Sequence, residues 1–134
     1  MSSAPKTYYE KEIDRLYSEI PLRPKQYLLI RQSKAFMEKY HSERIELNDL
    51  AKAAFMSRFH YVRTFKQMYG VTPRNYLKDM RISKAKALLK EGYSITHTCY
   101  DVGYESLTTF SAVFKKGTGY SPKEFQKLNK SNLE

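Results

Sequence analysis

An internal repeat constrains this chain more than any other feature of its sequence. Two stretches match at an offset of 49 residues. The matched residues are Ser57 and Ser106, Tyr61 and Phe110, Phe65-Lys66 and Phe114-Lys115, Gly70 and Gly119, Thr72-Pro73-Arg74 and Ser121-Pro122-Lys123, and Tyr76 and Phe125. Upstream of the two serines the register shifts by one residue, so that Leu50-Ala51 pairs with Thr98-Cys99. The fold must therefore contain one unit twice.

Each copy of the repeat has the pattern of a short helix, a brief turn and a longer helix. Ser57 and Ser106 are good N-caps for the longer helix, which should end at Gly70 in the first copy and at Gly117 or Gly119 in the second. This pattern predicts a helix-turn-helix in each copy. A helical solenoid can have a similar period, but two copies are too few to stack into one.

The rest of the chain also predicts helices, and no alternating strand pattern competes with them, so we expect an all-α fold. The expected parts are an N-terminal arm over 1–27 with an amphipathic helix at 8–20, a first unit over 28–72, a linker helix over 73–92, a second unit over 93–128, and a tail over 129–134. The first unit should open with a helix over 28–41. Its expected inward residues include Leu29, Ala35, Phe36 and Tyr40.

Charge indicates the kind of partner. The chain has 24 Lys+Arg against 14 Asp+Glu, a net charge of +10. Residues 57–90 hold nearly all of the excess, with nine basic side chains and one acid, Asp79. Such a block inside a folded, aromatic-rich segment indicates an anionic partner, most commonly nucleic acid. The single Cys99 excludes an internal disulfide, and no apolar run is long enough for a membrane span, so we expect a cytoplasmic protein.

The two longer helices should each turn one stripe of side chains inward and another outward. The inward residues are Tyr61, Phe65 and Met68 in the first copy, and Phe110, Val113 and Phe114 in the second. The outward residues are Arg58, Phe59, Val62, Arg63, Lys66 and Gln67, then Leu107, Thr108, Ser111, Ala112, Lys115 and Lys116. Each outer face offers hydrogen-bonding or methyl-sized groups early and cations late. A helix that enters the major groove requires this arrangement.

Three sets of residues carry a resemblance to a known family. They are Ser57…Arg63-Thr64-Phe65-Lys66…Gly70-Val71-Thr72-Pro73…Tyr76, then Val102-Gly103-Tyr104…Phe110…Phe114-Lys115…Gly119-Tyr120-Ser121-Pro122…Phe125, and between them Arg81…Ala85…Leu88-Leu89. Over about 28–128 the chain resembles the AraC/XylS family of bacterial transcription regulators. The resemblance implies two homeodomain-like three-helix units, joined by a linker helix and docked in successive major grooves of duplex DNA.

The resemblance also implies which side chains read the bases. These positions fall on Arg58, Phe59, Val62 and Arg63 in the first copy, and on Leu107, Thr108, Ser111 and Ala112 in the second. We add Ser57, Lys66, Ser106 and Lys115 as DNA-binding residues at the helix caps and next to the phosphates.

The chain departs from the family pattern in several places. Phe55 stands where many relatives have glycine in the first turn, whereas the second copy keeps Gly103. Cys99 replaces a usual alanine, and we expect a small buried side chain there. The base-reading positions of the second copy lack Arg, Gln and Asn, so they have little capacity for bidentate base recognition. There is no room for the sensing domain of most family members. We therefore expect a stand-alone regulator or a piece of a larger one.

Other chemistry has little support in the sequence. His41, His60 and His97 lack metal-ligand spacing, and no Gly-rich phosphate loop occurs. We therefore expect no enzyme activity, metal, cofactor or small-molecule site. Arg81 could contact phosphate or join the two units by pairing with Asp101 or Glu105, and we favour the second role.

The predicted function is sequence-specific binding of double-stranded DNA in the regulation of transcription. Two other classes stay open, a basic helical protein–protein adaptor and an RNA-binding module. We expect a monomer. Dimerisation through the helix at 8–20 and a contact with RNA polymerase are alternatives that the sequence does not decide.

Overall fold

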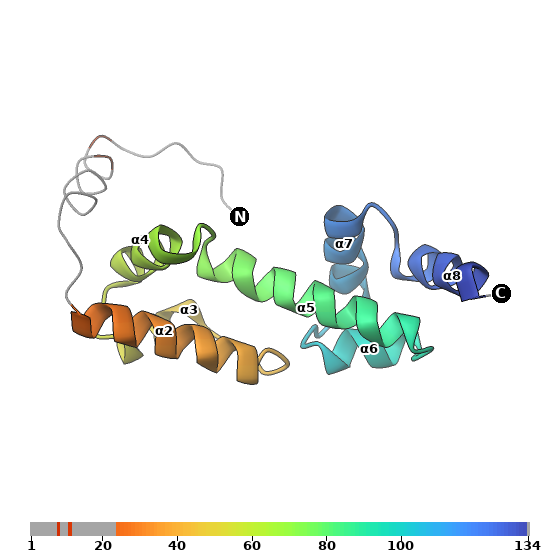
Figure 1. Ribbon diagram of the computed structural model, residues 1–134, viewed down its shortest axis with the longest axis horizontal. Coiled ribbons are helices and arrows are strands. Elements are labelled where there is room, and N and C mark those ends of the chain that lie inside the picture. Colours follow the sequence, from red (N-terminus) through yellow and green to blue (C-terminus); the bar gives the residue numbers. More distant parts are fainter. Residues whose placement is uncertain (1–7, 9–10, 12–23, 134) are drawn as a thin grey trace.

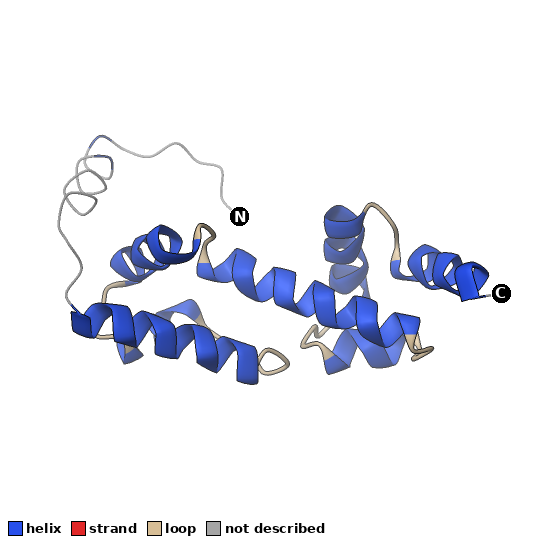
Figure 2. Cartoon of the chain, viewed as in Figure 1, coloured by secondary structure: helices blue, strands red, loops and turns tan. Residues whose placement is uncertain are grey.

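The described part of the chain, residues 8, 11 and 24–133 of a computed structural model, contains helices and no strand (Figures 1 and 2). The helices are α2 (Pro24–Lys39), α3 (Leu47–Ala53), α4 (Arg58–Tyr69), α5 (Pro73–Lys90), α6 (Ile95–Asp101), α7 (Leu107–Thr118) and α8 (Pro122–Leu133). The all-α prediction is confirmed. Of the helix expected over residues 8–20, only Tyr8 and Lys11 lie within the described residues.

The helices form two units, one at each end of α5. Figure 1 shows α2, α3 and α4 around one end of this helix, and α6, α7 and α8 around the other. Helix α5 has 18 residues, which gives a length of about 27 Å at 1.5 Å per residue. The two helix-turn-helix pairs, α3–α4 and α6–α7, are therefore held apart by one continuous helix.

Each unit has its own hydrophobic core, and α5 contributes to both. The first core is built around Ile30, Met37, Tyr61 and Phe65, and the second around Ile82, Leu89, Phe110 and Phe114. Tyr76, Leu77 and Met80 from the first half of α5 pack on the first core. Ile82, Ala85 and Leu89 from its second half belong to the other. Because α5 is part of both cores, both units pack on one continuous helix.

The predicted capping residues begin and end the helices as the repeat implied. The hydroxyls of Ser57 and Ser106 accept hydrogen bonds from the backbone N–H groups of His60 and Thr109, each at 3.1 Å. Gly70 and Gly119 end α4 and α7 in the left-handed conformation, with φ of 79° and 86°. The serines satisfy N–H groups that have no partner inside the helix, and the N–H groups of the two glycines donate to carbonyls of the last turn, those of Lys66 and Lys115.

The prediction for the first helix was wrong in its start and in its inward face. Helix α2 begins at Pro24, four residues before the expected start at 28. Its buried residues are Ile30, Ser33 and Met37, whereas the predicted Ala35, Phe36 and Tyr40 are exposed. Leu29 is half-buried, in accord with the prediction.

The inward face of α2 differs from the prediction because Ser33 occupies a buried position. Its hydroxyl donates to the carbonyl of Ile30 at 2.7 Å and accepts from the Tyr61 hydroxyl at 2.9 Å. A polar group that has hydrogen-bond partners can occupy a core position at little cost.

Candidate nucleic-acid interface

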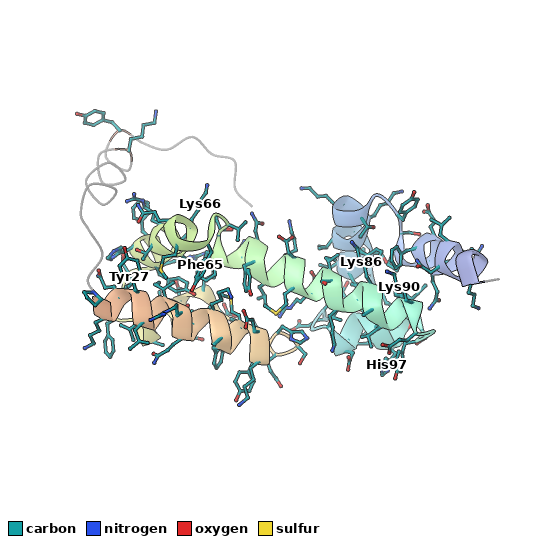
Figure 3. The ribbon with its side chains drawn as sticks, in the orientation of Figure 1. Tyr27, Phe65, Lys66, Lys86, Lys90 and His97 are labelled. Carbon is teal, nitrogen blue, oxygen red and sulfur yellow. The ribbon has the colours of Figure 1, made fainter. Side chains whose placement is uncertain are left out.

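Helix α4 holds the first set of predicted DNA-binding residues. Figure 3 shows Lys66 on the outer side of α4 and Phe65 between α4 and α2. Arg58 and Lys66 are exposed, while Phe59, Val62 and Arg63 are half-buried. The Arg63 guanidinium carbon lies 5.8 Å from the centre of the Phe59 ring, a distance typical of a cation–π contact. The contact between Arg63 and Phe59 therefore helps to hold the outer face of α4 in place.

Helix α7 holds the second set. Leu107 at its start is 39% exposed, and Thr108, Ala112 and Lys115 are exposed as well. Ser111 is half-buried, and Phe110 and Phe114 on the opposite stripe are buried. This face thus presents apolar and hydroxyl groups over its first turns and lysines at its end. The predicted inward and outward stripes of α7 are confirmed.

A cationic cavity lies between α3, α5 and the start of α4. It has a volume of about 360 Å³ and is lined by four basic side chains, Arg58, Arg74, Lys78 and Arg81, against one acid, Glu46. A second cavity of about 740 Å³ shares Arg81 and Glu46 with it and extends to Ser106 and Thr109 at the start of α7. The two cavities share lining residues and together form a groove from the start of α4 to the start of α7. Only the first cavity is cationic, because the second adds Glu105 as well as Arg44.

The sequence prediction did not place Arg74 and Lys78 in the site. Arg74, Lys78 and Arg81 are separated by four and then three residues. This spacing puts all three side chains on one side of α5. That spacing is the signal that could have identified them.

Arg81 has the structural role that we favoured, but its expected partners were wrong. Its Nε donates to the His41 carbonyl at 2.7 Å, and its Nη2 donates to the Glu43 carbonyl at 2.9 Å. Its guanidinium carbon lies 5.5 Å from the centre of the Tyr104 ring. Burial lowers the pKa of Arg81, while the neighbouring Tyr104 acts in the opposite direction. A five-donor guanidinium can bind two backbone carbonyls of one loop at once, so it does not need Asp101 or Glu105.

Each helix-turn-helix turn contains a residue with positive φ, although the residue types differ. Phe55 has φ of 56° and Gly103 has φ of 102°. Both values lie in the region that glycine adopts readily and other residues rarely do. The first turn therefore keeps a positive φ at the position where the sequence has Phe55 in place of glycine.

Two other predicted residues have a clear environment. Cys99 is fully buried, as expected, and burial raises the pKa of its thiol. His60 is half-buried on α4, and its pKa is lowered first by burial and then by the charge of Arg63. A neutral His60 therefore accompanies the cations of α4 at neutral pH.

The described residues offer little for other kinds of site. They contain no cluster of three or more potential metal ligands and no helix long and apolar enough to cross a membrane. A mainly apolar cavity of about 330 Å³ lies between α2 and α3, next to Leu29, Phe36 and Ala53. The expected lack of a small-molecule site therefore stays a prediction.

Comparison with known proteins identifies the family. A family model described as a helix-turn-helix domain matches residues 50–128, more than half of the chain. A regulator from Chromobacterium violaceum with an AraC-type DNA-binding domain has a similar structure, with a TM-score of 0.66 and 25% identity over 77% of this chain and 93% of that one. The chain belongs to the AraC/XylS family.

Two relatives support the assignment of the chain to this family. YdeC, an HTH-type transcriptional regulator of Bacillus subtilis (strain 168), is 34% identical over 101 residues, which cover 75% of this chain and 35% of YdeC. RhaS of Escherichia fergusonii, an HTH-type transcriptional activator, is 30% identical over 101 residues, or 75% of this chain and 36% of RhaS. This AraC/XylS chain thus spans about a third of the length of each relative.

One solved structure contains DNA. The DNA-binding domain of AdpA, solved in complex with a target DNA, has a TM-score of 0.73 and 24% identity over 77% of this chain and 94% of that one. The two proteins therefore share the fold in which AdpA was solved with DNA.

Proposed function

We propose that this AraC/XylS chain regulates transcription by binding double-stranded DNA, with α4 and α7 in successive major grooves on one face of the duplex. The observation that carries the proposal is the pair of serine-capped helices at the two ends of α5. Major grooves on one face recur about every 34 Å. Helix α5 spans about 27 Å, and the reach of each unit covers the remainder.

The α4 face would supply most of the base recognition. Arg58 and Arg63 can each donate two parallel hydrogen bonds to a guanine edge, the most selective contact available in the major groove. Phe59 and Val62 lie beside them and suit apolar contact with thymine methyls. Lys66, exposed at the end of the face, would bind phosphate.

The α7 face would read its half-site more loosely. Leu107, Thr108 and Ala112 offer apolar contacts to thymine methyls, and Ser111 offers a hydroxyl. Lys115 and the backbone N–H groups at the Ser106 cap suit phosphate oxygens.

The first cavity, the cationic part of the groove, would bind the DNA backbone between the two half-sites. Arg58, Arg74 and Lys78 line it from two helices, with Glu46 as the one acidic side chain of that cavity. Phosphate binding by such a groove is independent of sequence and strengthens as salt is lowered.

The wider biology is proposed by similarity. RhaS is named a transcriptional activator, which supports activation as the outcome of binding. We propose a bacterial cytoplasmic regulator without catalytic activity, and a contact with RNA polymerase would be the means of activation.

Selection of bound duplexes from a random library tests the proposal. We expect one enriched motif with two blocks whose centres lie about one helical turn apart. The selected duplex is then titrated against a shuffled duplex and a single-stranded RNA of the same sequence at one salt concentration. Enrichment of no motif, or equal binding of all three ligands, would overturn the proposal in favour of a general anion-binding adaptor or an RNA-binding module.

A further inference from the structure

Arg81 lies near the middle of α5 and contacts both units at once. Towards the first unit it binds the carbonyls of His41 and Glu43, in the loop between α2 and α3. Towards the second unit its guanidinium lies 5.5 Å from the centre of the Tyr104 ring, in the turn between α6 and α7. One side chain therefore joins two loops that belong to different helix-turn-helix units.

Gly103 closes the same junction from the second unit. A Cβ at this position would lie 2.8 Å from the His41 carbonyl oxygen and 3.1 Å from Arg81 Nε. The 2.8 Å distance to the backbone is too short for any residue with a side chain unless the two loops separate. The α6–α7 turn is therefore in direct contact with the loop of the first unit.

This junction is the main link between the units apart from α5 itself. Among the described helices, every extensive packing contact that bridges the two ends involves α5, and none joins α2, α3 or α4 directly to α6, α7 or α8. Bending or twisting of α5 between its two cores would turn α7 relative to α4. Arg81 opposes that motion because it ties both loops to one point on the helix.

We propose that Arg81 is a positioning residue that sets how strictly the protein discriminates between spacings of its two half-sites. This inference rests on the proposed function, because it requires that α4 and α7 bind one duplex together. Inserting one base pair moves the second half-site by about 3.4 Å and rotates it by about 36°. A rigid pair of units fits such a duplex poorly, whereas a looser pair adapts to it.

The experiment compares two duplexes that carry the selected half-sites at the selected spacing and with one extra base pair. The measured quantity is the ratio of the two dissociation constants, for the whole chain and for its Arg81→Lys variant. Lysine keeps the charge but lacks the fork of donors that binds two carbonyls. We expect the ratio to fall at least about threefold in the variant, a shift at the lower end of measured couplings between interacting groups.

Control variants separate positioning from other roles. Arg31→Lys makes the same chemical change on the exposed surface of α2 and should leave the ratio unchanged. Tyr104→Leu removes the ring against Arg81 from the second unit and should lower the ratio as Arg81→Lys does. Circular dichroism establishes whether each variant is folded. If Arg81→Lys does not fold, Tyr104→Leu is the test of the inference.

The outcomes distinguish this inference from the proposed function. If the variants bind both duplexes more weakly by the same factor, Arg81 is a phosphate contact or a stability residue, and the inference is overturned. If the unaltered chain binds the selected duplex no better than a shuffled one, the proposed function itself fails. A reduced ratio with specific binding intact supports both.

Discussion

Phe55 occupies a backbone conformation that suits glycine, and its side chain lies outside the core. Among the described residues it alone combines a side chain with positive φ, and it is 82% exposed. A left-handed residue other than glycine costs about 1–2 kcal/mol, of which glycine's greater chain entropy offsets about 0.5–1 kcal/mol. Phe55→Gly should therefore raise the free energy of unfolding by up to about 1 kcal/mol, as measured by urea denaturation.

Gly103→Ala is the matched control at the equivalent turn. The added Cβ would meet the His41 carbonyl at 2.8 Å and keep the strained φ of 102°. It should lower the free energy of unfolding by at least about 1 kcal/mol. If Phe55→Gly also destabilised the protein, the contact of the exposed ring with Lys25, whose Nζ lies 5.8 Å from the ring centre, would outweigh the relief of backbone strain.

Arg63 and Lys66 lie on the same face of α4 but should differ in what they recognise. Arg63→Ala should weaken binding to the selected duplex by about 1–3 kcal/mol and to a shuffled one by much less, because the arginine would bind a base edge. Lys66→Ala should weaken both duplexes alike and reduce the salt slope by about one unit. Fluorescence anisotropy titrations at several salt concentrations measure both effects. Equal reductions in affinity for the two duplexes in both variants would make Arg63 a phosphate contact.

At the scale of a single helix, α2 presents one apolar surface to the core and another to solvent. Met37 is fully buried, while its neighbour Phe36 is 46% exposed. Met37→Ala should lower the free energy of unfolding by about 2–5 kcal/mol because it leaves a cavity in the core of the first unit. Phe36→Ala should cost less than about 1 kcal/mol. Thermal denaturation of the two variants compares them, and a larger destabilisation by Phe36→Ala would contradict the observed orientation of α2.

The sequence predicts the helices that have local signals and fails where tertiary contacts decide. Ser57, Ser106 and Gly70 act through chemistry within a few residues, so both helix starts and the end of α4 were predicted correctly. Helix α7 ends at Gly119, one of the two glycines that the sequence offered. The inward face of α2 depends on the hydrogen bond between Ser33 and Tyr61, 28 residues apart in the chain. No local pattern shows such a partner.

The candidate site also has a part that the sequence predicts and a part that depends on tertiary contacts. The outer faces of α4 and α7 follow from helical periodicity alone. The groove and the Arg81 junction do not, because they arise where the two units meet on α5. The structural role of Arg81 was predicted, but its partners are backbone carbonyls, which carry no signature in side-chain chemistry.

At the scale of the whole molecule, the two halves should contribute unequally to binding. The first recognition helix and α5 hold almost all of the excess positive charge, and counterion release scales with the number of phosphates neutralised. The α7 face offers mainly apolar contacts, which discriminate less than a bidentate arginine and favour a degenerate, A/T-biased half-site read partly through DNA shape. Scrambling the half-site under α7 should therefore cost clearly less affinity than scrambling the one under α4, at one fixed salt concentration. Equal costs would mean that Lys115, Lys116 and the Ser106 cap make up the difference.

A footprint on the selected duplex tests the central claim most directly, because it shows how much DNA one chain covers. Hydroxyl-radical cleavage is measured at a protein concentration where sedimentation shows the complex to contain a single chain. The account predicts one asymmetric protected region of about 20 base pairs, with protection concentrated on one face in two blocks about one helical turn apart. Protection of a single half-site of about 10 base pairs by one chain would contradict it.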